Sequence, residues 1–247
     1  MAYRLGSFIW IINGAIGPLL SMSIWLIISS QTHLPLNQSQ IVSYFFLSLL
    51  VSRLTQVWTL DQVGDWIKDG GFSNILVKPY NYIIENLSRQ FAEKSIRLTA
   101  LVPFMIIIFP FFVSRLSFNF APFRIILFLL AVIMGFILLF IWEHTLALLA
   151  FWTHETHGIS SVHDTLRNLF SGYAIPLVFM PGFLKSIMTI YPARFTTSFP
   201  LEILVAQASA KDIVNGFAIG LTWLFLFIII YRWLFKKGIQ KYTALGG

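Results

Sequence analysis

The residues best suited to chemistry lie around one polar stretch, 153–168, where histidines stand beside acidic side chains. The groups from which a zinc site or a general acid–base site could be built are His144, His154, His157, His163, Glu143 and Glu155. A helical zinc-hydrolase motif needs two histidines four residues apart with a glutamate between them. Residues 154–157 read H-E-T-H, so the spacing is three. The pattern favours polar loop residues, with an enzyme built on the histidines as the least favoured alternative.

Other chemical motifs are missing from the sequence. It contains no Gly-x-x-x-x-Gly-Lys-Ser/Thr loop for nucleotide phosphates and no Gly-x-Ser-x-Gly nucleophile turn. Without cysteine, disulfides, thiolate catalysis and Cys-based metal sites are excluded. We therefore expect a protein that is not itself an enzyme and that holds no metal or cofactor.

The elements that must position any site are membrane helices. The chain is 57% hydrophobic and 11% charged, with a mean hydropathy of +0.78, whereas soluble domains are about 25% charged. Its 25 Phe and 8 Trp suit lipid-facing surfaces and interfacial belts. The net charge of +7 does not indicate a nucleic-acid partner, because no soluble module presents a basic face.

Apolar runs of about 20 residues predict an all-α membrane protein with six transmembrane helices in one domain, 1–247. The expected spans are 5–29, 41–60, 96–113, 123–151, 169–183 and 213–235. The first run is too long for the apolar region of a signal peptide, so we expect it to be retained.

Six spans place both termini on one side of the bilayer. The basic residues expected on that side are Arg4, Lys68, Lys78, Arg89, Lys94, Arg97, Arg167, Arg232, Lys236, Lys237 and Lys241, against Arg115, Arg124, Lys185, Arg194 and Lys211 on the other. The excess predicts cytoplasmic termini.

Two charges are expected inside the membrane. Arg53 lies in the second span and Glu143 near the inner end of the fourth. Such charges are functional candidates by default, although Arg53 could instead reach the headgroups or pair with Asp61 or Glu143. The scarcity of further intramembrane acids argues against a proton-coupled carrier.

The segment 82–98 predicts an amphipathic helix leading into the third span. Ile83, Ile84, Leu87 and Phe91 would share the apolar side. Charges of alternating sign recur every fourth residue and predict i,i+4 ion pairs on the wet side, at Glu85, Arg89, Glu93 and Arg97. A solvated interfacial helix and a direct partner contact both fit this pattern.

The polar interruption 61–79 predicts a compact knob of short helices suited to docking another protein. Gly70-Gly71 can end one helix, Ser73 or Asn74 can cap the next, and Pro79 would stop it. In an interface, Trp66, Phe72 and Ile75 would be the buried anchors and Asp65, Lys68, Asp69 and Lys78 the rim.

The segment 185–212 is apolar although it follows five spans. We expect it to pack on the bundle as short helices broken at Pro192 and Pro200. It is either a structural lid or an outer gate on a substrate path. The residues assigned to the gate are Pro181, Tyr191, Pro192, Phe199, Pro200 and Glu202.

Four segments carry a family resemblance over nearly the whole chain. They are DWIKDGGFSNILVKPYNYIIENLSRQFAEK at 65–94, SGYAIPLVFMP at 171–181, YPARFTTSFPLEI at 191–203 and KYTALGG at 241–247. Together, in this order, they resemble the permease subunit of an ABC-2-type (exporter-class) ABC transporter, in the branch of small six-span permeases.

The resemblance implies a fold and partners. The loop between spans 2 and 3 would be a cytoplasmic coupling helix seated in an ABC ATPase subunit, its pattern falling on Asp69, Gly70, Gly71, Ser73, Leu76 and Pro79. Segment 185–212 would form extracellular re-entrant helices. A second permease, identical or paralogous, would complete the path in a bacterial plasma membrane. ATP and Mg²⁺ would bind the ATPase.

The resemblance leaves three points open. The amphipathic helix that many members carry before the first span is nearly missing, since four residues precede the apolar run. The substrate is not indicated. An ATPase-independent channel or secondary carrier is the alternative function.

Overall fold

The computed structural model describes residues 2–79, 81–118, 120–153, 156–206 and 208–242, with side chains from Gly14 onward. Every regular element in these ranges is a helix: α1 Ala2–Gln31, α2 Gln38–Thr55, α3 Thr59–Lys68, α4 Phe72–Leu76, α5 Tyr82–Phe112, η1 Val113–Arg115, α6 Pro122–Ala147, α7 Ala150–Thr153, α8 His157–Phe170, η2 Leu177–Phe179, α9 Gly182–Ile190, η3 Pro192–Thr196, α10 Ser198–Leu204 and α11 Ala210–Lys241. The all-α prediction is confirmed.

Five stretches of the described chain are long and apolar enough to cross a membrane. They are Gly14–Gln31, Gln38–Lys68, Tyr82–Arg115, Pro122–Thr153 and Ala210–Lys241, and they correspond to the predicted spans 1, 2, 3, 4 and 6. The motif at 241–247 and the pair His154 and Glu155 fall wholly or partly outside the described residues.

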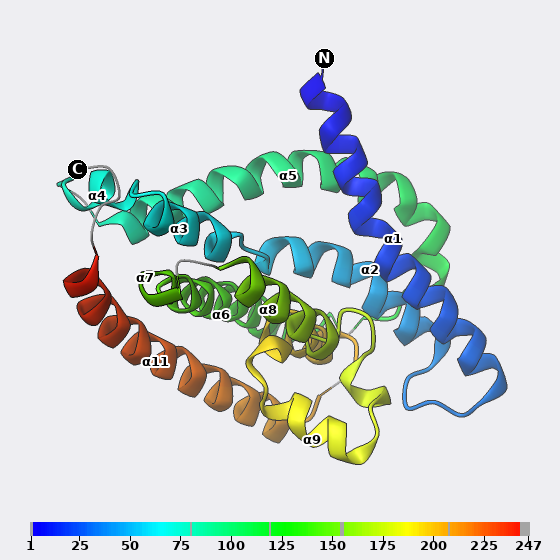
Figure 1. The fold of residues 1–247 in the computed structure, drawn as a ribbon. Helices are drawn as coiled ribbons and strands as arrows, with labels where there is room; N and C mark the ends of the chain where they lie inside the picture. The colour runs from blue at the N-terminus through cyan, green and yellow to red at the C-terminus, as the bar shows by residue number, and fades with distance from the viewer. Residues whose placement is uncertain (1, 80, 119, 154–155, 207, 243–247) are drawn as a thin grey trace.

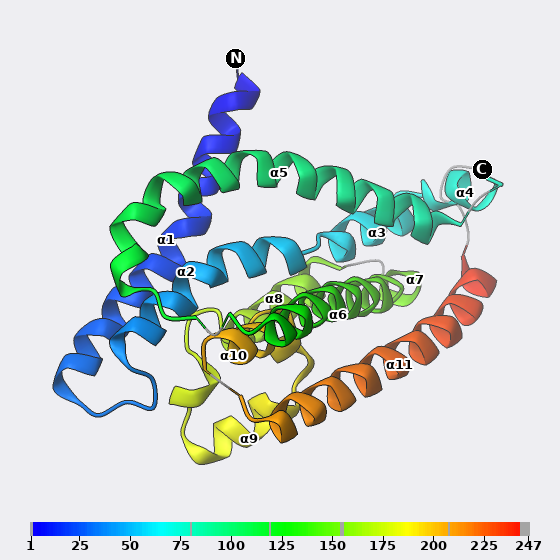
Figure 2. The same cartoon turned by 180° about the vertical axis from the view of Figure 1, so that it is seen from behind.

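Helix α6 is the centre of the bundle, and α2, α3, α10, η3 and α11 all pack against it. Most residues in the second half of α6 are buried, and the side chains of Leu138 and Leu139 have no solvent-exposed surface. Figures 1 and 2 show α5 and α11 on opposite sides of α6 and α8. One end of the bundle gathers α4, α7 and the end of α11. We call it the α4 end. The starts of α2, α6 and α11 lie with α9 at the other, which we call the α9 end.

The predicted fifth span, 169–183, is wrong as a single helix. Helix α8 stops at Phe170, residues 171–176 are irregular, η2 follows, and α9 begins only at Gly182. Gly172 turns the chain at φ 83°, a region that residues with a Cβ rarely enter. Pro176 and Pro181 then withhold backbone donors that a continuing helix would need.

The middle of the segment 185–212 packs on the bundle, whereas residues 185–187 and 209–212 at its two ends are exposed. All residues from Pro192 to Val205 are buried, and η3 lies midway along α6, where a Cβ on Gly135 would fall 2.2 Å from the carbonyl oxygen of Phe195. The break at Pro192 is confirmed. The break at Pro200 is wrong, because Pro200 lies in the first turn of α10, where its missing N–H is not required.

Helix α5 joins the predicted amphipathic segment and the third span in one helix of 31 residues, with Pro103 and Pro110 inside it. The ion pairs on its wet side are confirmed, for example Arg89 to Glu85 at 2.8 Å. The predicted apolar side is wrong in part, since Ile84 and Phe91 are more than half exposed. The bundle instead receives a row of polar side chains at i,i+4 spacing, namely Asn86, Gln90 and Lys94.

Candidate functional site

The α4 knob, residues 65–79, is attached to the bundle through Phe72. This side chain is fully buried, and its ring meets those of Tyr82, Phe151 and Tyr242 edge-on, at centroid distances of 5.2, 5.8 and 5.9 Å. The backbone N–H of Ser73 also donates to the Tyr242 hydroxyl at 3.1 Å. One aromatic cluster therefore joins α4 to α5, α7 and the end of α11.

The turn between α3 and α4 depends on Gly70, which has φ 77°, a conformation that favours glycine. Helix α4 then begins at Phe72 with Gly71 before it. The prediction that Ser73 or Asn74 caps this helix is wrong: Ser73 lies inside α4, and its hydroxyl donates back to the Gly70 carbonyl at 2.7 Å. Helix α4 ends at Leu76, ahead of Pro79.

The outer face of the knob is apolar at its tip. Val77 is 83% exposed and Leu76 is 40% exposed, and exposed Asp69, Asn74 and Pro79 surround them. Phe72 was predicted to be buried by a partner, but its side chain is buried within this protein, against Tyr82, Phe151 and Tyr242. Val77 was not predicted as part of the docking surface. Its position in the sequence, between Leu76 and the charged Lys78 of a polar loop, could have indicated an exposed apolar residue.

The remaining predicted knob residues lie on the sides. Lys78 is paired with Glu85 of α5 at 3.2 Å. Trp66 is half-buried, with the Arg89 guanidinium 5.8 Å from its ring centroid. Asp65 lies 4.0 Å from a ring nitrogen of His157. Lys68 and Ile75 are half-buried, so they contribute to the edge of the exposed surface.

Helix α3 connects the knob to α6 through Glu143. Its N-cap residue, Trp58, supplies no side-chain acceptor. The first backbone N–H groups of α3 are instead hydrogen-bonded to the Glu143 carboxylate. The N–H groups of Thr59 and Leu60 donate to Oε2 at 2.8 and 3.2 Å. The other oxygen, Oε1, lies 3.7 Å from Nε2 of His163 on α8. A single buried carboxylate thus links α3, α6 and α8.

The three predicted histidines that the structure describes do not converge. His163 lies beside Glu143, His157 beside Asp61 and Asp65, and His144 faces the carbonyl of Phe140. Among the described residues, no group of three or more His, Asp or Glu side chains could hold a metal ion.

Arg53 lies at the end of α2 with Gln56, to whose Oε1 it donates at 3.0 Å. Its guanidinium also packs against Gly14 of α1, where an added Cβ would collide with Nη2. Of the two carboxylates suggested as its partner, Glu143 accepts hydrogen bonds from the start of α3, and Asp61 lies in α3, 3.8 Å from a ring nitrogen of His157.

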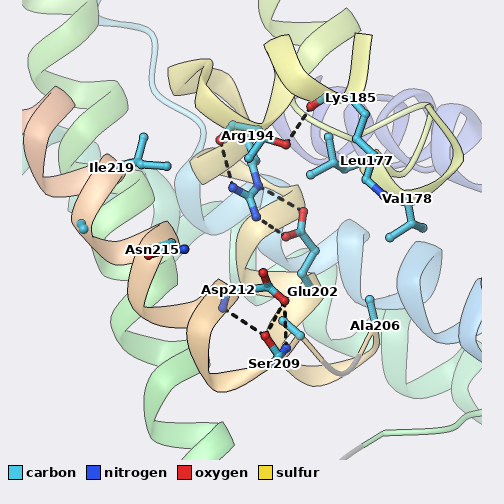
Figure 3. A pocket seen from close by; sticks show the side chains of 13 residues that line it. Leu177, Val178, Lys185, Arg194, Glu202, Ala206, Ser209, Asp212, Asn215 and Ile219 are labelled. Carbon is cyan, nitrogen blue, oxygen red and sulfur yellow. Dashed lines mark hydrogen bonds and ion pairs between the residues drawn. The ribbon is translucent and has the colours of Figure 1, made fainter. Parts of the chain in front are cut away.

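At the α9 end, a cavity of about 630 Å³ lies between α9, α10 and the start of α11 (Figure 3). Charged groups line it from three directions: Lys185, Arg194 and Glu202, and Asp212. Asp212 completes a capping box with Ser209 at the start of α11. The cavity therefore combines charged groups with apolar residues such as Leu177 and Ile219, and the capping box fixes its α11 side.

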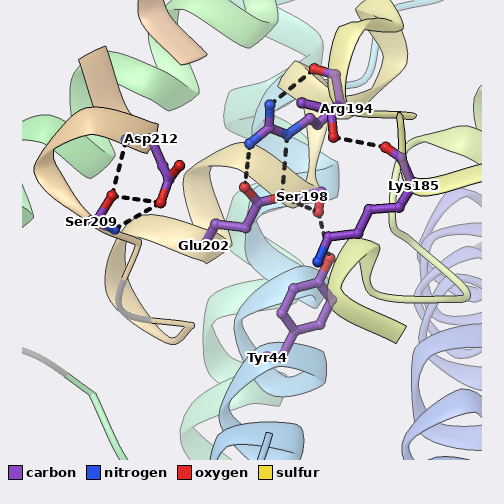
Figure 4. Close-up of polar contacts among 8 residues, drawn as sticks. Tyr44, Lys185, Arg194, Ser198, Glu202, Ser209 and Asp212 are labelled. Carbon is purple, nitrogen blue, oxygen red and sulfur yellow. Dashed lines mark hydrogen bonds and ion pairs between the residues drawn. The ribbon is translucent and has the colours of Figure 1, made fainter. Parts of the chain in front are cut away.

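Buried hydrogen bonds hold η3 and α10 together at the wall of this cavity (Figure 4). Arg194 and Glu202 form a two-bonded ion pair at 2.6 and 3.3 Å, and Ser198 donates to the same carboxylate at 2.7 Å. The Tyr44 hydroxyl of α2 lies 3.3 Å from Ser198 and donates to the Gly172 carbonyl at 2.9 Å. These hydrogen bonds connect residues 194–202 to α2 through Tyr44 and Ser198.

The residues assigned to the gate fall around this network. Phe199, Pro200 and Glu202 are buried in α10, and Pro192 is buried at the start of η3. Tyr191 is half-buried, with its ring 5.9 Å from that of Trp142 on α6, whereas Pro181 is exposed before α9. Arg194 was not among the predicted site residues. A cation eight residues before a glutamate in an apolar segment was the signal that pointed to the pair.

A comparison with protein families decides the identity. The family described as "ABC-2 family transporter protein" matches residues 19–246. The chain belongs to this ABC-2 transporter family. Neither the curated proteins nor the solved structures contain a match.

Membership agrees with the sequence resemblance and with the long apolar helices. This ABC-2 chain is a multi-pass membrane protein, the permease component of an ABC transporter and not itself a catalytic subunit. Within the permease, the α4 knob lies at one end of the bundle (Figure 1), the Arg194–Glu202 network joins η3 and α10 beside the middle of α6, and α6 contacts α3, η3 and α10.

Proposed function

We propose that this ABC-2 permease is a subunit of an ATP-driven exporter that separate ATPase subunits drive through the α4 knob. A second permease, identical or paralogous, completes the substrate path. ATP and Mg²⁺ bind to the ATPase subunits. The chain lies in a bacterial plasma membrane, with both termini and the α4 end in the cytoplasm.

The observation that carries the proposal is the exposed tip of the knob. A valine that is 83% exposed, next to an exposed leucine on a helix of five residues, leaves apolar surface uncovered at an end of the molecule outside the apolar spans. An ATPase cleft that receives Leu76 and Val77 would bury this surface. Asp69 and Lys68 at its edge supply polar contacts typical of an interface rim.

The contacts of the knob support transmission to the bundle. A displaced α4 carries the Phe72 cluster, and with it α7 and the end of α11, while α3 acts on α6 through Glu143. Packed helices move as rigid bodies because close-packed interiors deform little. A partner that contacts the two states differently can therefore shift the whole bundle.

The outer gate of the proposed path is formed by α9, η3 and α10 as re-entrant helices. Both η3 and α10 pack against α6, so a movement of α6 reaches them directly, and α9 follows through its contacts with η3. The Arg194–Glu202 pair keeps η3 and α10 together as one moving element.

The proposal is tested by purifying the tagged chain from its native membrane in mild detergent and measuring ATP hydrolysis and ATPase subunit content. We expect a stoichiometric ATPase subunit, and its loss in Val77→Asp. Val214→Asp is the matched control, because Val214 is 67% exposed in the second turn of α11, at the far end of the bundle.

ATPase content that is equal in both variants would contradict the docking role of the knob. Transport by vesicles that contain the chain without any ATPase would overturn the proposal and favour a channel or secondary carrier.

A further inference from the structure

A second cavity, distinct from the one at the α9 end, lies between the end of α2, the end of α8 and η3. We call it the α2–α8 cavity. Its volume is about 430 Å³, within the range of roughly 300–1,000 Å³ of small-molecule sites. In a chain that is 57% hydrophobic, this cavity is lined by hydroxyl, amide and guanidinium side chains, with Ala174 as the exception.

Two guanidinium groups line this cavity from different helices. Arg53 comes from α2 and Arg167 from α8. The Nη2 group of Arg167 is paired with Asp164 at 2.9 Å, but its Nε is buried without a hydrogen-bond partner. Because this Nε has almost no accessible surface, other atoms of the Arg167 side chain line the cavity, and they bring its positive charge to the wall.

The surroundings of the cavity are positively charged. Lys94 donates to the carbonyl oxygens of Arg53 and Gln56, which neutralises the negative end of α2. The charge of Arg97 acts on Arg53, and Arg97 is paired with Glu93. Three acids, Asp164, Glu93 and Glu143, thus stand against four cations around the end of α2.

The hydroxyl groups of the cavity are largely committed to the protein. Thr55 Oγ1 donates to the Thr196 carbonyl at 2.8 Å, Thr196 Oγ1 to that of Ala193, and Tyr173 to that of Gly14 of α1 at 3.1 Å. These bonds fix the walls, and the two guanidinium groups supply positive charge to the lining. The planar fork of a guanidinium fits the paired oxygens of phosphate.

From this geometry, we propose that the α2–α8 cavity binds a phosphate-type oxyanion, and so selects transported molecules that carry one. The role in transport rests on the proposed function. The binding step does not, because it needs neither ATPase nor a second permease.

Binding to the purified chain in a neutral detergent is measured by calorimetry with three probes: short-chain phosphatidylglycerol, a diacylglycerol of the same chain length that lacks the phosphate, and inorganic phosphate. We expect phosphatidylglycerol to bind and the diacylglycerol not to bind. Arg53→Gln and Arg167→Gln should each weaken binding about tenfold or more, the loss of a charged hydrogen bond, and lysine at either position should restore part of it.

Arg115→Gln is the matched control, since Arg115 is exposed in η1 away from the cavity. Thermal melting without ligand shows whether each variant is folded. Binding of inorganic phosphate with the same dependence on both arginines assigns the site to a free anion. The inference is overturned if none of the three probes binds. It is also overturned if Arg115→Gln weakens binding as much as Arg53→Gln and Arg167→Gln do. If the Val77 test still succeeds, the proposed function is retained.

Discussion

Replacing Glu143 is the sharpest test of how the α4 knob is connected to the bundle. The carboxylate accepts two backbone N–H groups, those of Thr59 and Leu60, and both residues are buried. Glu143→Leu keeps a similar volume and removes both acceptors. Glu143→Gln keeps one acceptor and removes the charge that interacts with the positive start of α3.

The magnitude follows from these contacts. Leaving buried donors unsatisfied costs about 1–3 kcal/mol for each group, so two donors give at least about 2 kcal/mol for Glu143→Leu. Since 1.4 kcal/mol corresponds to a factor of ten, local opening of α3 should become about thirtyfold more frequent. For Glu143→Gln, the loss of a charge at a helix start is about 0.3–1 kcal/mol, or about twofold to fivefold.

Hydrogen exchange of the amides in α3, Thr59–Lys68, measures this directly. The expected order of exchange rates is Glu143→Leu above Glu143→Gln above the unchanged protein. Glu93→Gln serves as the control, because Glu93 is 41% exposed and pairs with Arg97 on the outside of α5. Exchange rates in α3 that do not change in a folded Glu143→Leu variant would refute the connection between α3 and α6.

Three further predictions follow from buried contacts. Phe72→Ala should destabilise the α4 knob locally by about 3–5 kcal/mol, seen as faster proteolysis there with an unchanged melting temperature of the bundle; a uniform loss of stability would contradict this. Gly135→Ala should lower the melting temperature, because the new methyl group would overpack against η3 at a cost of about 1–3 kcal/mol. Gly158→Ala should leave the melting temperature unchanged, because no atom lies within 4 Å of the new Cβ. Equal losses of melting temperature in the two variants would contradict the prediction. Neutralising Arg194 or Glu202 alone should cost about 3–5 kcal/mol because each leaves a buried charge unpaired, and a double replacement by Met and Leu should cost less than either single change in a chemical unfolding series.

The local features of the chain were largely predictable from the sequence. Helix type and position followed from apolar run length, and the i,i+4 ion pairs of α5 followed from spacing, because both depend on residues within one or two turns. The turn at Gly70 and the separation of the knob from the spans also came from local signals. The break after Phe170 was missed because the apolar run continues across it, and an irregular backbone there is supported by contacts with distant residues.

The sequence by itself determined an all-α membrane protein, its family resemblance and the place of the knob. Only the tertiary structure decided which polar groups act together. Glu143 caps a helix that begins 84 residues earlier in the chain, Phe72 is an internal anchor, and Arg53 and Arg167 line one cavity from separate helices. Such relations depend on how helices pack against each other, since a side chain's distant partners follow from the packing of several elements and not from its sequence neighbours.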